Sequence, residues 1–306
     1  MPVLEGSSGR RNMEIKTINP GNMRPQIKFL NDIVYSETSG LSLMLSVMRK
    51  AGKTKVLSVG HYQEMVDKAF PAVLWFNGAR WTGVDKNQML PELTFLADAG
   101  YAVVCVYYRS VYQGKFPDQV IDCKTAVRFI RANAEKFHID PDRIAVMGRS
   151  AGGYLASFLA MNTDDYEGTE YPGYSSKVKA CVDMFGPVDL RAAIEADKKN
   201  PRLKSLLDGP TGLLLGGDEA TLEERAVKAS VTSFVNKGMC PIMIAHGDCD
   251  QVVDCGQSVR FAELAAAVCG DENVEAYLLK DANHGDDPFY QDTFKDLIVE
   301  FLRKHL

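Results

Sequence analysis

The sequence predicts an α/β protein with a mostly parallel central sheet that is covered by helices on both faces. Two observations support this fold class. Short runs that are apolar at every position, typical of strands buried on both sides, occur at residues 72–76 and 101–107. A helix pattern at residues 90–99 lies between them, and strand and helix patterns alternate through most of the 306 residues. We therefore expect one large α/β domain over residues 13–306.

The first strands are expected to lie antiparallel at one edge of this sheet. Residues 41–47 alternate apolar and small polar side chains, as a half-buried strand does. Residues 33–35 before them are the expected hairpin partner. Between residues 51 and 68 the pattern is lost, so we expect an irregular connection there.

The later elements follow from the same periodicities. The clearest helix is expected at residues 118–137, where apolar side chains recur every three or four positions and charged ones lie on other faces. Further strands are expected at residues 143–147, 178–185, 242–245 and 274–279, and further helices at 154–160, 258–268 and 289–306.

Residues 188–236 interrupt the alternation of strands and helices. They carry a helical charge pattern at residues 219–228 and turn residues at 208–210 and 216–218. An insertion of this size after a strand end predicts a small lid over the carboxyl edge of the sheet, where ligands bind in such folds.

Composition excludes several kinds of partner. The hydrophobic share of 46% and the charged share of 25% are ordinary for a globular protein. The formal net charge of −5 and the lack of a long basic run argue against nucleic acid. No apolar run reaches the roughly 18–20 residues that span a bilayer. A small-molecule ester is the expected partner, and the sequence leaves a homo-oligomer open.

The terminus and the cysteines indicate a reduced, cytoplasmic protein. Residues 1–12 lack the apolar segment of a secretory signal, and we expect a flexible extension of the kind that cloning leaves. Among the seven cysteines, Cys105, Cys123 and Cys181 fall within apolar patterns and are expected to be buried thiols. Cys249 and Cys255 match no zinc spacing, and a disulfide between them is the less favoured alternative.

The main chemical signal is Gly148-Arg149-Ser150-Ala151-Gly152-Gly153. This G-x-S-x-G pattern lies between an expected strand and an expected helix, so the chain must turn sharply at Ser150. Glycines on both sides remove Cβ atoms that would clash in such a turn. The serine hydroxyl is then exposed beside a helix N-terminus, as in a nucleophile elbow. The alternative is a glycine-rich turn without chemistry.

A nucleophilic serine needs a base, usually a histidine that a carboxylate orients. Where the serine lies on such an elbow, the order along the chain is serine, acid, histidine. Of the five histidines, His61 and His138 precede Ser150, and His305 lies in the last helical turn. His246 at a strand end is more simply a packed histidine. His284, in the loop between the last strand and the last helix, is the predicted base.

The acid is expected just beyond the strand at residues 242–245. Asp248, Asp250 and Asp254 all qualify by position. Asp250, which precedes Gln-Val-Val, fits best, and Asp248 is the second choice. Any of the three is also explained as a solvated turn aspartate.

The reaction further needs two backbone donors for the oxyanion. One is the N–H of Ala151, directly after the nucleophile. The other is expected from the loop Asn77-Gly78-Ala79-Arg80-Trp81, at the N–H of Gly78 or Ala79. Loss of one such donor typically costs about 3–4 kcal/mol of transition-state stabilisation. The simpler interpretation of this loop is an ordinary turn.

As a set, these motifs resemble the esterase/lipase branch of the α/β-hydrolase superfamily. That branch includes hormone-sensitive-lipase-like enzymes and the bacterial feruloyl and acetyl-xylan esterase-like group. The resemblance runs from about residue 71 to the C-terminus and rests on residues 76–81, 140–144, 148–156, 185–190, 246–253 and 283–285. It implies that Asp250, the aspartate before the x-Val-Val step, is the acid of the triad.

One departure from this resemblance lies in the oxyanion loop. Relatives usually carry His-Gly-Gly-x where this chain has Asn77-Gly78-Ala79-Arg80. Backbone donors survive the change, but Ala79 adopts positive φ less freely than glycine, so the loop shape is open. Arg80 could bind an acidic substrate group or pair with a neighbour, and with Trp81 and Arg149 it forms the set of further substrate-binding candidates.

The predicted function is a serine carboxylester hydrolase that works through an acyl-enzyme, without a metal or an organic cofactor. Short-chain acyl esters and sugar or phenolic esters are the substrates that the resemblance implies. The alternatives are an amidase, formamidase or peptidase of the same fold, and a non-catalytic binding protein on a hydrolase scaffold. The altered loop at Asn77 motivates the last of these.

Overall fold

The computed structural model describes residues 16–19, 26–83 and 85–306. Its central strands are β1 (Ile27–Thr38), β2 (Leu41–Lys50), β5 (Phe70–Phe76), β6 (Ala102–Val106), β7 (Ile139–Arg149), β8 (Ala180–Met184), β9 (Ile242–Gly247) and β10 (Val274–Leu279). They form an eight-stranded sheet in the order β1-β2-β6-β5-β7-β8-β9-β10. The first two pairings are antiparallel and all others are parallel, so the mostly parallel sheet is confirmed.

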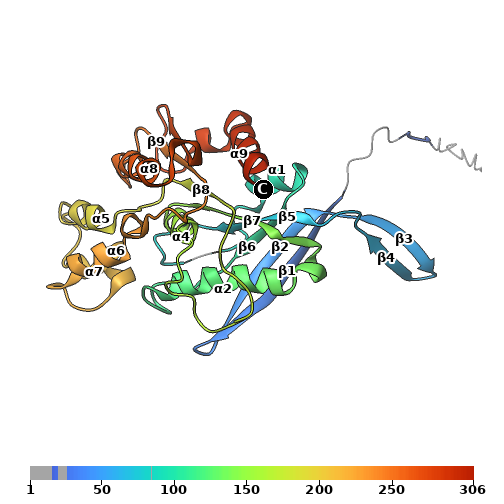
Figure 1. Cartoon of the computed structure of the whole chain (residues 1–306), viewed down its shortest axis with the longest axis horizontal. Helices are drawn as coiled ribbons and strands as arrows, with labels where there is room; N and C mark the ends of the chain where they lie inside the picture. Colours follow the sequence, from blue (N-terminus) through green and yellow to red (C-terminus); the bar gives the residue numbers. More distant parts are fainter. Residues whose placement is uncertain (1–15, 20–25, 84) are drawn as a thin grey trace, which may run out of the picture.

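Helices cover both faces of this sheet (Figure 1). They are α1 (Leu90–Asp98), α2 (Asp118–Ala132), α3 (Ala134–Phe137), α4 (Ala151–Ala160), α8 (Gly256–Cys269) and α9 (Asp292–His305). Buried residues of α1 and α9 pack with one face of the strands. Those of α2, α4 and α8 pack with the other. The alternation of apolar runs and amphipathic helices therefore produced the expected layers.

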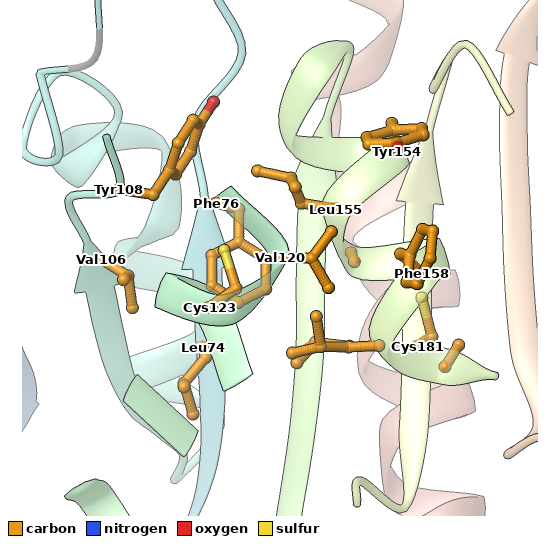
Figure 2. Packing of buried hydrophobic residues seen from close by; sticks show 14 of the residues in the cluster. Leu74, Phe76, Val106, Tyr108, Val120, Cys123, Tyr154, Leu155, Phe158 and Cys181 are labelled. Carbon is orange, nitrogen blue, oxygen red and sulfur yellow. The ribbon is translucent and has the colours of Figure 1, made fainter. Parts of the chain in front are cut away.

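The larger core cluster lies between the sheet, α2 and α4. Tyr154, Leu155 and Phe158 of α4 belong to the same buried cluster as Val120 and Cys123 of α2 (Figure 2). All five side chains are fully buried. Since α4 follows directly after Ser150, this packing fixes the helix whose N-terminus the serine occupies.

The register of the parallel strands brings their carboxyl ends to one edge of the sheet. Phe76 at the end of β5 is opposite Gly148 of β7. Arg149 is opposite Met184 at the end of β8, and Met184 is opposite Ala245 of β9. Leu279 at the end of β10 is likewise opposite Gly247 of β9, so the loops that carry the predicted site residues all begin at this edge.

The segment at residues 51–68 corrects one prediction. Instead of an irregular connection, it forms a hairpin of β3 (Lys53–Ser58) and β4 (His61–Met65). The hairpin projects from the body of the molecule (Figure 1). Every residue of β3 is exposed. Because β3 is not buried on either face, its sequence needs no alternation of apolar and polar residues. The hairpin therefore could not be predicted from the sequence pattern.

Smaller differences concern element ends. The helix expected at residues 118–137 ends at Ala132, because Asn133 leaves helical geometry and its side chain caps the carbonyl of Phe129 at 2.9 Å. The short helix α3 completes that range. The last helix begins only at Asp292, after the 3-10 helix Asp287–Tyr290. The strands β1 and β7 extend beyond their apolar runs.

The interruption at residues 188–236 contains α5 (Leu190–Asp197), α6 (Pro210–Leu215) and α7 (Leu222–Ala229), with the 3-10 helices Leu206–Asp208 and Val231–Phe234. The three α-helices lie together at one end of the molecule (Figure 1). α5 begins where the Asp189 carboxylate accepts hydrogen bonds from the N–H groups of Arg191 and Ala192.

Two further observations concern the N-terminal residues and the search for membrane-spanning helices. The flexible extension expected at residues 1–12 lies outside the described residues. Within the described ranges, no helix combines the length and the apolarity needed to cross a membrane.

Candidate active site

Ser150 lies on a sharp turn between β7 and α4. Its backbone has φ 52° and ψ −123°, an unfavourable conformation for a residue with a Cβ atom. The turn is held by a hydrogen bond from the Ser150 N–H to the carbonyl of Met184 at 2.8 Å. A Cβ at Gly148 would lie 2.2 Å from the carbonyl oxygen of Gly152. The glycine pattern in the sequence is therefore a steric requirement of this turn.

The structure brings Ser150, His284 and Asp250 into one hydrogen-bonded row. His284 Nε2 lies 2.9 Å from Ser150 Oγ. His284 Nδ1 lies 2.7 Å from Asp250 Oδ2. A proton on Nδ1 can be donated to the carboxylate, which leaves Nε2 free to accept the serine proton.

The Asp250 carboxylate is fully buried and has four hydrogen-bond donors. Oδ2 also receives a hydrogen bond from His246 Nε2 at 3.0 Å, and Oδ1 accepts from the N–H groups of Val252 and Val253 at 2.7 and 2.9 Å. Burial alone would raise the pKa of Asp250, but the hydrogen bonds from His246, His284 and these amides hold it well below its ordinary value. The carboxylate is therefore ionised throughout the neutral range.

The other acid candidates lie elsewhere. Asp248 is exposed on the surface. The Asp254 carboxylate accepts from the N–H of Gly256 and lies 3.6 Å from Arg260. His246 is fully buried, as expected of a packed histidine, and its Nδ1 is 2.7 Å from Ser258 Oγ. Its contact with Asp250 was not predicted. The sequence feature that could have indicated it is the position of His246 four residues before the candidate acid.

The oxyanion loop, residues 77–81, packs directly against the nucleophile turn. A Cβ at Gly78 would lie 2.6 Å from the carbonyl oxygen of Arg149 and 2.8 Å from Ser150 Cβ. Within the described residues, no acceptor is paired with the N–H of Gly78, Ala79 or Ala151. These three groups are therefore available as donors beside the serine.

The sequence left the shape of this loop open, and the positive-φ residues lie after Ala79. Ala79 is not among the residues with positive φ; Arg80 and Trp81 are, at 53° and 57°. Trp81 is buried and packs edge-on against Tyr154, with ring centroids 5.4 Å apart. The replacement of the second glycine by Ala79 is thus compatible with the loop conformation.

Arg149, a predicted substrate-binding residue, is placed differently. It does not line the pocket beside Ser150. Its Nε donates to Asn77 Oδ1 at 3.0 Å, and a terminal nitrogen donates to the hydroxyl of Tyr290 at 3.0 Å. The side chain therefore contacts the oxyanion loop and the segment after His284 instead of a substrate space.

Two residues of the β8 end support the site and were not expected from the sequence. Phe185 has φ 46°, and its ring packs edge-on against His284 at a centroid distance of 4.6 Å. Asp183 is fully buried; its carboxylate accepts from Ser157 Oγ at 2.6 Å and from the Gly186 N–H at 2.9 Å. For Asp183 the sequence showed only an aspartate inside an apolar strand run, and Phe185 begins the motif at residues 185–190 without an assigned role.

A pocket of about 380 Å³ opens above Ser150. Arg80 and Trp81 form one wall, and α5 with the segment after it forms another. The remaining lining comes from Ser150, Ala151, Pro187, Pro210, Thr211, Gln251, Val252, Val253, Asp254 and Gln257. The predicted candidates Arg80 and Trp81 therefore border this space together with the serine.

One surface group among the described residues could offer three metal ligands. It consists of Asp248, Cys249 and Asp281, all exposed, with ligand atoms within 4.8 Å of one another. Exposed acidic groups of this kind are common without an ion. The row of Ser150, His284 and Asp250 does not include any of them.

The family model BD-FAE matches residues 61–264 of this chain. Among curated relatives, the probable carboxylic ester hydrolase LipM of Mycobacterium tuberculosis is 27% identical over 212 residues, covering 68% of this chain and 48% of LipM. The esterase LipC of the same organism is 28% identical, covering 76% of this chain and 57% of LipC. The chain thus spans about half the length of the curated relatives it matches.

Solved structures of esterases resemble this chain over most of its length. A truncated carbohydrate esterase from gut microbiota is 25% identical with a TM-score of 0.74, covering 91% of this chain and 96% of that one. The bifunctional GH43-CE protein of Bacteroides eggerthii is 26% identical with a TM-score of 0.76, covering 90% of this chain and 35% of that one. A thermophilic esterase of Thermogutta terrifontis, 22% identical with a TM-score of 0.68, covers 92% of both chains and shares the fold. The predicted α/β-hydrolase fold is confirmed.

Proposed function

The chain belongs to the BD-FAE family of α/β-hydrolase esterases, and from this premise we propose that it is a serine carboxylester hydrolase that works through an acyl-enzyme. The observation that carries the proposal is the row of Ser150, His284 and Asp250, with distances of 2.9 and 2.7 Å. The names of the relatives LipM and LipC, a carboxylic ester hydrolase and an esterase, support the same reaction class.

In the first half of the reaction, Ser150 Oγ forms a bond to the acyl carbon while His284 Nε2 takes the hydroxyl proton. The imidazolium that results is stabilised by the buried Asp250 carboxylate. The N–H groups of Ala151 and of Gly78 or Ala79 donate to the oxygen that becomes negative. The bond from carbon to the alcohol oxygen then breaks, and His284 gives its proton to the leaving alcohol.

In the second half, water cleaves the acyl-enzyme. His284 Nε2 takes a proton from water as the water oxygen bonds to the acyl carbon. The bond to Ser150 Oγ breaks, Oγ recovers the proton from the imidazolium, and a carboxylic acid leaves. Phe185, packed against the imidazole, keeps the ring within reach of both oxygens.

The pocket favours esters whose alcohol or acyl part carries hydroxyl groups. Arg80 and Asp197 both line it, and neither side chain forms an ion pair or hydrogen bond with another described residue. Burial raises the pKa of Asp197, and the Arg80 charge offsets part of this effect. Hydroxyl groups can donate to the carboxylate and accept from the guanidinium. This polarity and the carbohydrate esterase among the structural relatives favour sugar or phenolic esters.

Fluorophosphonate labelling tests the nucleophile. We expect wild-type protein to be labelled at Ser150 and Ser150→Ala to remain unlabelled, because only an activated serine reacts. A wild type that does not label would make the chain a binding protein on a hydrolase scaffold. Equal labelling of the variant would place the nucleophile elsewhere.

A substrate panel then tests the bond that is cleaved and the group that is recognised. It should contain acetyl, butyryl and feruloyl esters, an acetylated xylo-oligosaccharide and a formamide. Asp197→Asn and Arg80→Met should raise KM for the acetylated sugar and leave KM for 4-nitrophenyl acetate unchanged. Faster cleavage of the formamide than of every ester would replace the esterase assignment by an amidase.

A further inference from the structure

Arg149 occupies the first variable position of the G-x-S-x-G turn and contacts both the oxyanion loop and the segment after His284. We propose that it is a positioning residue that fastens two loops to the nucleophile turn: the oxyanion loop and the histidine loop, residues 280–291. This inference rests on the proposed function and explains how the chain works without the His-Gly-Gly pattern.

The link to the oxyanion loop passes through Asn77, whose side chain is fully buried and uses all of its polar atoms. Asn77 Oδ1 accepts from Arg149 Nε at 3.0 Å. Asn77 Nδ2 donates to the carbonyl of Asp85 at 3.1 Å and to Gln88 Oε1 at 3.0 Å. Its backbone carbonyl accepts from the hydroxyl of Tyr108 at 2.6 Å. Asn77 is therefore held on every side, and Arg149 supplies the one bond that comes from the nucleophile turn.

This bond matters because Gly78, directly after Asn77, is a candidate oxyanion donor. Gly78 has no spare space: a Cβ there would meet both Arg149 and Ser150 within 2.8 Å. A Cβ at Gly152 would lie 1.9 Å from the carbonyl oxygen of Phe76. The two loops are therefore in backbone contact, and the Arg149–Asn77 bond fixes how the Gly78 and Ala79 amides face the serine.

The link to the histidine loop passes through Tyr290. A terminal nitrogen of Arg149 donates to the Tyr290 hydroxyl at 3.0 Å. The same hydroxyl lies 3.8 Å from the position of a Cβ at Gly285, the residue after His284. Gly285 has φ 73°, so this turn depends on glycine and on the groups around it. Arg149 thus contacts the segment that carries the base.

The chemistry of arginine fits this role better than an ion-pair role. Among the described residues, no carboxylate lies within salt-bridge distance of Arg149, and both of its partners are neutral side chains. A guanidinium presents five donors in a rigid planar fork, so one side chain can serve two acceptors in fixed directions. Lysine offers one flexible ammonium and cannot reproduce that geometry.

The test is a kinetic comparison of Arg149→Met, Tyr290→Phe and the double variant, each normalised to active sites by fluorophosphonate titration. We expect Arg149→Met to lower kcat for 4-nitrophenyl acetate by about tenfold to hundredfold, the range for a displaced catalytic group, with KM nearly unchanged. Tyr290→Phe removes one hydrogen bond and should lower kcat by about two- to tenfold. Because Tyr290 acts through Arg149, the double variant should be no slower than Arg149→Met.

A trifluoromethyl ketone provides the second readout. It forms a hemiketal oxyanion with the serine, so its inhibition constant should rise in Arg149→Met by the same factor by which kcat/KM falls. Arg149→Lys should recover little of either quantity. A purely structural role would lower the titrated amount of active enzyme and leave both normalised quantities unchanged.

Arg131→Met is the matched control, because Arg131 also joins loops through uncharged acceptors. It donates to the carbonyls of Pro141, Ser175 and Lys177 on segments outside the site. We expect reduced thermal stability and an unchanged kcat for this variant. A kcat for Arg149→Met equal to that of Arg131→Met would overturn the inference. So would a raised KM at constant kcat, which would return Arg149 to substrate binding.

The inference and the proposed function fail in different ways. If wild type neither labels nor hydrolyses any ester, the proposed function is lost and the inference with it. If wild type labels and hydrolyses while Arg149→Met matches it in kcat and in ketone inhibition, only the inference is lost. Should Arg149→Met fail to fold, the Tyr290→Phe and Arg149→Lys measurements decide the question.

Discussion

Asp183 is a carboxylate placed in the interior without an ion-pair partner among the described residues. Burial raises its pKa to about 6, although hydrogen bonds from Ser157 and the Gly186 N–H lower it in part. The folded state then binds this proton more tightly than the unfolded chain does. The free energy of unfolding should therefore fall as pH rises from about 4 to 6, and the deficit should persist above pH 6.

Asp183→Asn should remove this dependence, because the amide keeps an acceptor for Gly186 and cannot ionise. Relative to wild type, the variant should gain up to about 3 kcal/mol between pH 4 and pH 7, the value of a shift of roughly two pKa units. Urea unfolding from pH 4 to pH 7.5 measures the difference. Parallel curves for the two proteins would show that Asp183 does not titrate in this range.

The acid assignment is a second question at the scale of single residues. Asp250→Asn should lower kcat by about 10⁴-fold, since the wrong imidazole tautomer is then stabilised. Asp248→Asn, two positions away on the surface, should change kcat by less than twofold. Ester hydrolysis by the two variants measures this, and the reverse pattern would move the acid to Asp248.

Most candidate site residues could be located in the sequence because the roles proposed for them follow chain order. Ser150, Asp250 and His284 were found from a glycine pattern, a strand end and a loop. The contacts of Arg149 could not be predicted, because its direction depends on Asn77 and Tyr290, which lie far from it in sequence. The spacing of apolar residues along the sequence does not indicate which distant side chains Arg149 contacts.

At the scale of elements, the β3–β4 hairpin is mostly exposed to solvent. Val56, Leu57, Val59 and Tyr62 are all more than half exposed. Its base is anchored through Glu64, which accepts from Arg49, from Lys28 and from the N–H of Gly52. None of the hairpin residues lines the pocket above Ser150.

Shortening the hairpin should therefore leave catalysis intact. Replacement of residues 56–62 by Asn-Gly joins Lys55 to Gln63, which already pair, through a favoured two-residue turn. We expect kcat/KM for 4-nitrophenyl acetate to stay within about twofold of wild type, because Glu64 and its partners remain. A tenfold loss would show that the hairpin acts on the site.

Helices and strands could be predicted where burial requires apolar residues at regular positions. They could not be predicted where the element is exposed. The runs that became β5, β6 and β8 are buried at nearly every position, and each was located within a few residues. β3 is exposed throughout and was missed. The break at Asn133 depends on one side-chain cap within an otherwise regular amphipathic pattern.

At the scale of the whole molecule, the insertion at residues 188–236 shares the main core. Leu190, Ile194, Leu214 and Leu222 belong to the same buried cluster as the residues of α2 and α4. The insertion should therefore unfold together with the sheet and not before it. The sequence predicted a small lid with helical segments here, but it did not indicate that the insertion shares the core of α2 and α4.

Leu222→Ala on α7 tests this coupling. The side chain is fully buried, so we expect a loss of about 2–5 kcal/mol in the free energy of unfolding. The two tryptophans, Trp75 and Trp81, lie outside the insertion, and their fluorescence should shift to lower urea together with far-UV circular dichroism. Val227→Ala, on the same helix but 44% exposed, is the control and should change little. An unchanged fluorescence midpoint for Leu222→Ala would mean that the insertion unfolds alone.

The residues around Ser150 and those of α5 differ in how well they tolerate substitution by larger side chains. At the turn that carries Ser150, a Cβ at Gly78 or Gly152 would overlap neighbouring backbone atoms, so no larger residue fits there without moving the loops. On the opposite side, α5 presents Ala192, Ala193 and Ala196, small residues on a surface helix that can be exchanged for larger ones. New acyl or alcohol groups can therefore be accommodated by drift along one helix face while the reaction itself is conserved.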